Sequence, residues 1–290
     1  MSKEKIFKIS DDEIKRLYLE GNSLNDIAKV AQDTKGVMAL RNKLLKLGVN
    51  TTKDMRKYRY KLSASCKKYA LNEHIFDCID TEEKAYWLGW LFSDGYNHSS
   101  KCQVALRVQE EDVEILYKLQ DFLQTDAPIH TYKRVTKVNS LNRNYSELLL
   151  CSSHLSKRLS ELGCVQAKTL VLEFPDIPCQ LYQHFIRGYF DGDGCFSVIK
   201  RKDRKNPESK TYQFNIVGMH TVLAKIQNIL VQNTGVKRLP IKTRRGTKAE
   251  TLHYNGHSIC KKILDYLYKD ASIYLKRKHD KYCKYCTSAE

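Results

Sequence analysis

The fold is decided by two similar stretches of sequence, Ala85-Tyr-Trp-Leu-Gly-Trp-Leu-Phe-Ser-Asp-Gly95 and His184-Phe-Ile-Arg-Gly-Tyr-Phe-Asp-Gly-Asp-Gly194. Each is an apolar segment that ends in Asp-Gly, and the aspartates Asp94 and Asp193 lie 99 residues apart. Self-similarity over such a distance indicates two copies of one structural unit.

Both stretches carry small residues at every fourth position. In a helix these positions share one side, and small side chains there let two helix backbones approach closely. We therefore expect the two helices to pack against each other. The helix-interface residues predicted in this way are Ala85, Gly89, Ser93, Gly188 and Gly192, with His184 at the start of the second stripe.

The same series of elements follows each stretch. Alternating apolar residues predict strands over 104–108 and over 212–216. A helix then contains Leu119-Gln-Asp-Phe-Leu123 in the first copy and Ile226-Gln-Asn-Ile-Leu230 in the second. A second hairpin and closing helices complete each copy. The order predicts an α+β fold with two pseudo-symmetric αββαββα repeats.

The N-terminal region shows a different pattern. Ser10 and Glu13 form a capping box, and three short apolar-periodic helices follow, the last carrying Arg41, Asn42 and Lys43. This pattern is typical of a helix-turn-helix module that contacts DNA, and also of small helical packing domains. We expect a helix-turn-helix-like domain over 1–50, a basic linker over 51–75, and the two repeats over 76–182 and 183–290.

The charge of the chain indicates a polyanionic partner. Lys and Arg number 50 against 33 Asp and Glu, which gives a net charge of +17. Phosphate contacts by Lys and Arg dominate nucleic-acid affinity. The sequence has no apolar run long enough to span a bilayer, no secretory signal and ten irregularly spaced cysteines. We therefore expect an intracellular protein, in a cytoplasm, an organelle or a phage-infected host, with no membrane contact.

The nine positions Trp87–Gly95 and Ile186–Gly194 resemble the paired signature helices of the LAGLIDADG homing endonucleases, in the form with both copies on one chain. The resemblance implies a monomer with internal pseudo-twofold symmetry, whose repeats form a saddle around a central helix pair. It further implies site-specific hydrolysis of both strands of double-stranded DNA, with divalent metal ions, at a long asymmetric target, leaving short 3′ overhangs.

Asp94 and Asp193 are the candidate catalytic and metal-ligating residues. Two carboxylates at helix C-termini face the negative ends of the helix dipoles, and a shared Mg²⁺ would cancel that penalty because it prefers oxygen ligands. The glycine after each aspartate suits a left-handed cap. Asp191 corresponds to Phe92 in the first copy, so we expect it to make a local hydrogen bond.

Further site residues come from the resemblance and from strand patterns. The family supplies a basic residue near each metal site, and Lys168 and Lys276 occupy the matching places as catalytic candidates. The predicted strands also have polar faces, opposite to their apolar residues. Side chains on these faces that can hydrogen-bond to the edges of DNA bases are Gln103, Arg107, Gln213 and Asn215. The expected DNA-binding set also contains Lys133, Arg134, Lys242, Arg244 and Arg245.

Two alternative functions are compatible with the same fold. A splicing maturase would use the same saddle on RNA, and a transcriptional regulator would keep it without cleavage. Both motif aspartates are present, which favours the endonuclease.

Cys283 and Cys286 form a lone Cys-x-x-Cys pair, which we expect to be a flexible tail with two free thiols and not a zinc site.

Overall fold

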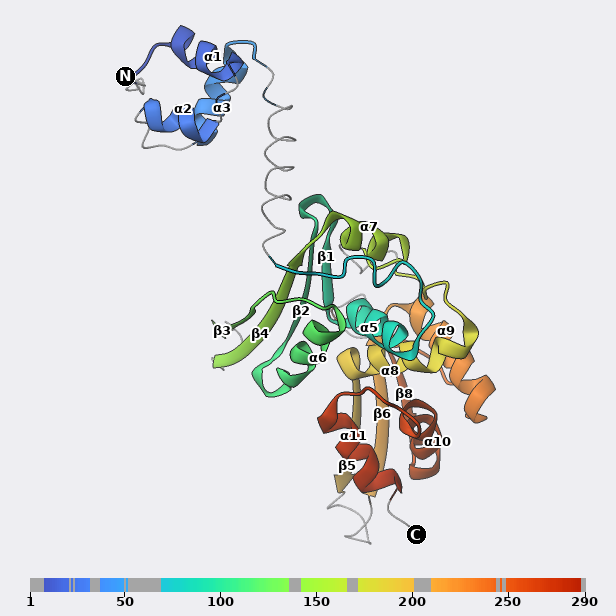
Figure 1. Ribbon diagram of the computed structural model, residues 1–290. Coiled ribbons are helices and arrows are strands. Elements are labelled where there is room, and N and C mark those ends of the chain that lie inside the picture. Colours follow the sequence, from blue (N-terminus) through green and yellow to red (C-terminus); the bar gives the residue numbers. More distant parts are fainter. Residues whose placement is uncertain are drawn as a thin grey trace. The chain divides into compact units, whose positions relative to one another are not determined.

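The computed structural model divides the chain into two compact units, residues 1–65 and 66–290. Each unit is described by itself (Figure 1). The structure describes residues 8–20, 24–31, 37–49, 69–135, 142–165, 172–200, 210–243 and 249–287, together with the single residues 22, 51 and 246.

The N-terminal unit is a small helical domain. Ser10 caps the first helix by accepting a hydrogen bond from the Glu13 backbone N–H, and Ile14, Ile27 and Leu40 are fully buried in its core. The expected small all-α N-terminal domain is confirmed. The helices are α1 (Asp11–Leu19), α2 (Leu24–Val30) and α3 (Val37–Lys46).

The first repeat begins with the first signature helix. Thr81 caps this helix by accepting from the Lys84 N–H, and Glu82 and Glu83 in its first turn complement the helix dipole. The repeat continues as an antiparallel sheet in the order β1-β2-β4-β3. Its elements are α5 (Glu82–Ser93), β1 (Gly95–His98), β2 (Gln103–Gln109), α6 (Glu114–Phe122), β3 (Ile129–Val135), β4 (Asn142–Cys151) and α7 (Ser153–Glu161), with short 3-10 turns at Ser99–Lys101 and Glu110–Asp112.

The second repeat follows the same plan, with its antiparallel sheet in the equivalent order β5-β6-β8-β7. The expected α+β fold of two αββαββα repeats is therefore confirmed. Its elements are a 3-10 turn at Cys179–Leu181, α8 (Tyr182–Asp193), β5 (Gly194–Lys200), β6 (Lys210–Gly218), α9 (His220–Thr234), β7 (Lys242–Thr243), β8 (Glu250–Asn255), α10 (His257–Tyr268) and α11 (Lys276–Tyr282), which continues as the π-helical segment Cys283–Thr287.

Helices α5 and α8 lie side by side between the two sheets (Figure 1). A Cβ atom built on Gly89 would lie 2.2 Å from the carbonyl oxygen of Phe185. One on Gly188 would lie 1.9 Å from the carbonyl oxygen of Tyr86. Because real side chains never approach a backbone so closely, glycine is required at both crossing points.

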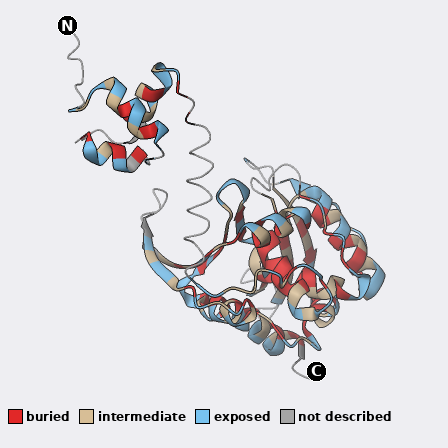
Figure 2. Ribbon diagram, turned by 45° about the horizontal axis from the view of Figure 1, so that its top comes forward, coloured by how far each residue is buried: buried red, intermediate tan, exposed pale blue. Residues whose placement is uncertain are grey.

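Apolar burial is concentrated around this helix pair. Every residue from Ala85 to Phe92 in α5 is buried, and the buried residues gather on the inner sides of the elements while their outer sides are exposed (Figure 2). Among the described residues, no helix has the length and apolarity needed to cross a membrane.

The glycines that follow the motif aspartates correct one expectation. Gly95 begins a strand and Gly194 has a φ of −97°, so neither adopts the left-handed cap conformation. Both are needed for close packing, since a Cβ on Gly95 would lie 2.5 Å from the Leu91 Cα and one on Gly194 would lie 2.1 Å from the Phe190 ring.

The C-terminal cysteine pair corrects another expectation. Cys286 is only 2% exposed and belongs to the main hydrophobic core. The expected flexible tail is therefore wrong for the segment Cys283–Thr287, which packs as a continuation of α11. The apolar surface of Cys286 explains the difference, because a free thiol is readily buried as a small hydrophobe.

The helix crossing predicts a sign reversal for Gly188→Ala. In an ordinary helix this change stabilises by up to about 1 kcal/mol. At the crossing the added methyl group overlaps the Tyr86 carbonyl, so we expect a loss of about 3 kcal/mol in the free energy of unfolding. Urea unfolding monitored by tryptophan fluorescence measures it. Gln232→Ala, on the exposed face of α9, is the control, and an equal or higher stability of Gly188→Ala would contradict the close crossing.

Candidate active site

The two motif aspartates lie at neighbouring helix ends. Asp94 caps α5 and is exposed, while Asp193 is the last residue of α8 and is half-buried. A Cβ atom on Gly192 would lie 1.9 Å from Ser93 Oγ and 3.2 Å from Asp94 Oδ2. The end of α8 therefore rests directly against the end of α5.

The buried phenol of Tyr189 is influenced by both carboxylates. Its pKa is raised by burial and then by the negative charges of Asp193 and Asp94. Glycine at position 192 lets the end of α8 approach Ser93 and Asp94 more closely than any other residue would allow. Two carboxylates at adjoining helix ends provide the oxygen donors that a hard divalent cation such as Mg²⁺ prefers, so the residues present fit such an ion.

A cavity of about 700 Å³ opens beside Asp94 on the outer face of the first sheet. It lies between the end of α5, strands β2 and β4, and the start of α11. Its polar lining includes Asp94, Arg107, Gln109, Asp112, Glu147 and Arg277. Each of its two arginines forms an ion pair with a carboxylate of the same lining, Arg107 with Glu147 and Arg277 with Asp112.

Arg107 is held in place on this face. Its guanidinium donates to Glu147 Oε1 at 2.7 Å and lies 5.4 Å from the centre of the Tyr132 ring. The register that pairs Arg107 with Glu147 also places Gln103 on the same face, because alternate residues of a strand share a side. Lys133 pairs with Asn144. It therefore lies on the same face of the sheet as Leu148, and Arg107 lies on the other face.

The second sheet presents a different set of polar residues. Gln213 and Asn215 share one face of β6 with Val217. Val217 pairs with Thr251 of β8, and Thr251 pairs with Lys242 of β7, so Lys242 lies on the same face. All three side chains are at least partly exposed. Lys168, Arg244 and Arg245, together with the side chain of Arg134, lie outside what the structure describes.

The closing helix brings Lys278, and not Lys276, to the aspartate-bearing end of α8. Lys278 Nζ donates to the carbonyl oxygens of Phe190 at 2.6 Å, Asp191 at 2.8 Å and Gly194 at 2.6 Å. Burial lowers the pKa of Lys278 to about 8, and the charges of Asp191 and Asp94 oppose this shift. Lys276 is exposed and forms an ion pair with Asp280 at 3.0 Å.

Asp191 makes hydrogen bonds, as expected, but none of them is local. Its carboxylate accepts from Tyr86 Oη at 2.9 Å, from the Leu275 N–H at 2.8 Å and from Tyr268 Oη. Burial raises its pKa, and Lys278 opposes the shift. Asp191 therefore ties α5, α10 and the segment before α11 together.

Sequence reasoning missed two groups that shape this site. Lys278 stands two residues from the lysine that the resemblance singled out, and sequence spacing does not decide which of them is buried. Arg277 donates to both oxygens of Asp112 at 2.7 and 2.9 Å, which joins the closing helix of the second repeat to the first repeat. No local sequence pattern predicts either contact.

Comparison with known families supports the resemblance. Residues 186–288 match the family described as LAGLIDADG endonuclease. This match runs from the second signature helix to the end of the closing helix, so it confirms the resemblance for the second repeat.

Among solved structures, three show similarity to this chain at low sequence identity. The meganuclease I-SmaMI bound to uncleaveable DNA is 14% identical over 69% of this chain and 88% of its own, with a TM-score of 0.47. The I-LtrWI LAGLIDADG homing endonuclease bound to target DNA is 11% identical over 71% and 89%, with a TM-score of 0.46. Full-length DUF199/WhiA from Thermatoga maritima is 15% identical over 74% and 64%, with a TM-score of 0.43. No curated protein matches the chain.

The buried position of Lys278 predicts a large difference between two neighbouring lysines. Lys278→Gln leaves three carbonyl oxygens and the Asp191 carboxylate without their cation, and we expect a loss of about 3–5 kcal/mol in stability. Lys276→Gln, on the same helix, is the matched control and should change stability little because its side chain is exposed. Urea unfolding of both variants tests this, and equal stabilities would contradict the burial of Lys278.

Proposed function

We propose that the chain is a site-specific endonuclease that hydrolyses both strands of double-stranded DNA. The observation that carries this proposal is that the end of α8, which carries Asp193, rests against the end of α5, which carries Asp94. Polar and basic residues lie on the outer faces of the two sheets. The family match of the second repeat supports the same reaction class.

Asp94 and Asp193 would hold divalent cations, with Mg²⁺ as the expected ion. A cation bound there supplies Lewis acidity toward the scissile phosphate and counter-charge for the leaving oxygen. The two carboxylates belong to different repeats, so each is placed to serve one strand. Water is the expected nucleophile, because a bound divalent cation can activate it for hydrolysis.

Basic residues near the carboxylates would stabilise charge that develops on the phosphate. Lys278 places its ammonium group at the end of α8, and the charge of Asp94 acts on it. It holds the helix end in place and contributes a fixed positive charge. Lys168 and Lys276 remain the candidates that the family resemblance adds for direct phosphate contact.

The outer faces of the two sheets would contact the duplex, with one repeat on each half of the target. The first face offers Arg107 and Gln103, and the second offers Gln213, Asn215 and Lys242. Because the two faces differ, the target should be asymmetric. One chain contains both halves of the site, so a monomer suffices.

The carboxylates can be tested on a target that the protein itself selects. Full-length protein is incubated with a library of randomised duplexes in Mg²⁺, and the cut ends are sequenced. We expect one long sequence to be enriched, with cuts in both strands. On that sequence Asp193→Asn and Asp94→Asn should each lower double-strand cleavage by about a hundredfold or more while DNA binding is kept.

Asp121→Asn, on the exposed side of α6, is the control and should cut as the unchanged protein does. Cleavage at the original rate by either motif variant would overturn the assignment of that aspartate. Selective binding with no cleavage of any duplex would instead indicate a regulator.

The N-terminal unit should add contacts to flanking DNA. It folds around its own core, and α3 carries Lys43 and Lys46 in its last turn. A chain that begins at Tyr69 should still cut the selected target but bind it with a flatter salt dependence. Each lost phosphate contact lowers the slope of log K against log salt by about 0.9.

The measurement is binding of the full and shortened chains to one long duplex over a salt series. The shortened chain keeps the bond from the Ala70 N–H to Asp126 Oδ1 at 2.6 Å, so the packing of the second unit is preserved. Identical slopes and identical footprints would show that the N-terminal unit does not touch DNA.

A further inference from the structure

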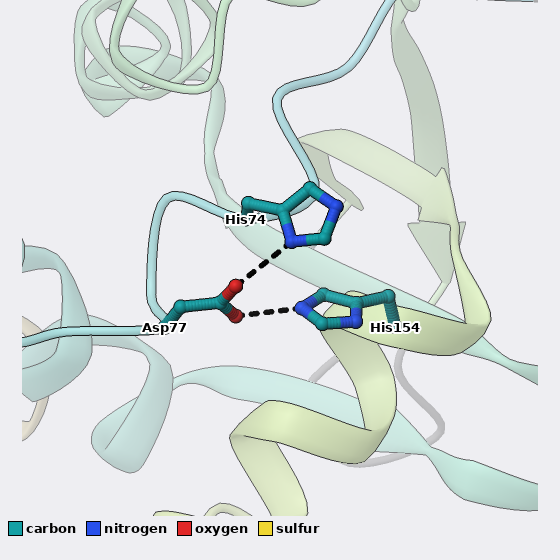
Figure 3. Close-up of side chains that lie close together, drawn as sticks. All are labelled: His74, Asp77 and His154. Carbon is teal, nitrogen blue, oxygen red and sulfur yellow. Dashed lines mark hydrogen bonds and ion pairs between the residues drawn. The ribbon is translucent and has the colours of Figure 1, made fainter.

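Two histidines and an aspartate converge outside the proposed active site (Figure 3). His74 Nδ1 lies 2.8 Å from Asp77 Oδ2, and His154 Nε2 lies 2.6 Å from Asp77 Oδ1. The ligand-type atoms of all three residues lie within 4.8 Å of one another. His74 and Asp77 belong to the segment before α5, and His154 to the first turn of α7.

The distances suit a bound cation after a small movement of side chains. Zn²⁺ binds imidazole nitrogen and carboxylate oxygen at about 2.0–2.2 Å, so ligand atoms around a tetrahedral ion lie about 3.3 Å apart. The two nitrogen–oxygen distances are shorter than this by about half an ångström. Rotation of exposed side chains provides the difference, because His74 and Asp77 are both exposed.

The backbone that carries these residues is already fixed. Ser152 Oγ donates to Glu73 Oε2 at 2.6 Å, and Arg158 Nε donates to the Phe76 carbonyl oxygen at 3.1 Å. Both contacts join the segment before α5 to α7 on either side of the cluster. The three side chains are therefore presented together by the fold, with no reorganisation of the backbone required for binding.

The local charge favours a cation over a phosphate. From residue 69 to residue 83 the sequence contains five acidic residues and no Lys or Arg, within a chain of net charge +17. This segment is a poor surface for DNA. Two imidazoles also select against Mg²⁺, which prefers oxygen ligands, and favour zinc and similar transition metals.

We propose that His74, Asp77 and His154 form a site for a Zn²⁺-type transition-metal ion that joins the segment before α5 to α7. In its absence each histidine donates a ring N–H to one oxygen of Asp77. When the ion binds, each neutral imidazole carries its single proton on the ring nitrogen that faces away from Asp77, so the nitrogen that faces Asp77 can ligate the ion. Asp77 stays as the carboxylate ligand, and water completes the coordination. The site lies before the start of α5, whereas Asp94 lies at the other end of that helix. Its role is structural and independent of DNA cleavage.

The test is equilibrium binding of Zn²⁺ to the full-length chain, measured by competition with a zinc-sensitive dye. We expect the His74→Gln/His154→Gln variant to bind one Zn²⁺ fewer per chain than the unchanged protein. Zn²⁺ should raise the melting temperature of the unchanged protein but not of this variant. Mg²⁺ at the same concentration should produce no such difference.

His220→Gln is the matched control, because His220 makes an equally short contact, 2.6 Å to Glu250. Within the described part of the chain this pair does not belong to a cluster of three ligand-type side chains. It should bind as many ions as the unchanged protein. Asp77→Asn provides a second test that keeps the size of the side chain and should also lose the ion. Unchanged Zn²⁺ stoichiometry in the two-histidine variant, or a loss of the same size in His220→Gln, would overturn the proposal.

Discussion

The close crossing of α5 and α8 is the contact on which the rest of the structure depends. Glycines at positions 89 and 188 let the two backbones touch, and this contact is also the interface between the repeats. The C-terminal ends of the two helices lie next to each other, so the same crossing sets the separation of Asp94 and Asp193. A wider crossing would separate the two carboxylates and the two sheets together.

The repeats share an architecture but fix their closing helices by different chemistry. In the first repeat, buried Asn97 donates to the carbonyl oxygens of Ser156 at 3.0 Å and Cys164 at 2.8 Å. In the second, Lys278 and Asp191 take this role as charged groups. A buried charge requires a partner, so the second repeat holds its closing helix through a coupled set of contacts. This difference makes the two halves of the proposed site electrostatically unequal.

Much of the fold could be predicted from the sequence because it follows local patterns. Strand alternation, helix caps and the repeated stretch ending in Asp-Gly are all short-range signals, and the small-residue stripe indicated how the two helices meet. The conformations of Gly95 and Gly194 could not be predicted in this way. Glycine suits both a left-handed cap and a tight contact, and only the packed neighbours decide between them.

The candidate site was less accessible to sequence reasoning. The two aspartates follow from the repeat, but the partners of Asp191 lie 77 to 105 residues away, and the choice of Lys278 over Lys276 depends on how α11 packs. The cluster of His74, Asp77 and His154 joins residues as many as 80 positions apart. Contacts of this kind arise only from the completed fold.

Asp94 and Asp193 are proposed to hold divalent cations together against DNA. The most direct measurement is a Mn²⁺ titration of the full chain bound to its selected duplex, with unbound Mn²⁺ counted by electron paramagnetic resonance. We expect the complex of the unchanged protein to retain Mn²⁺ ions that the Asp94→Asn/Asp193→Asn complex releases. Equal Mn²⁺ binding by the two complexes would contradict it.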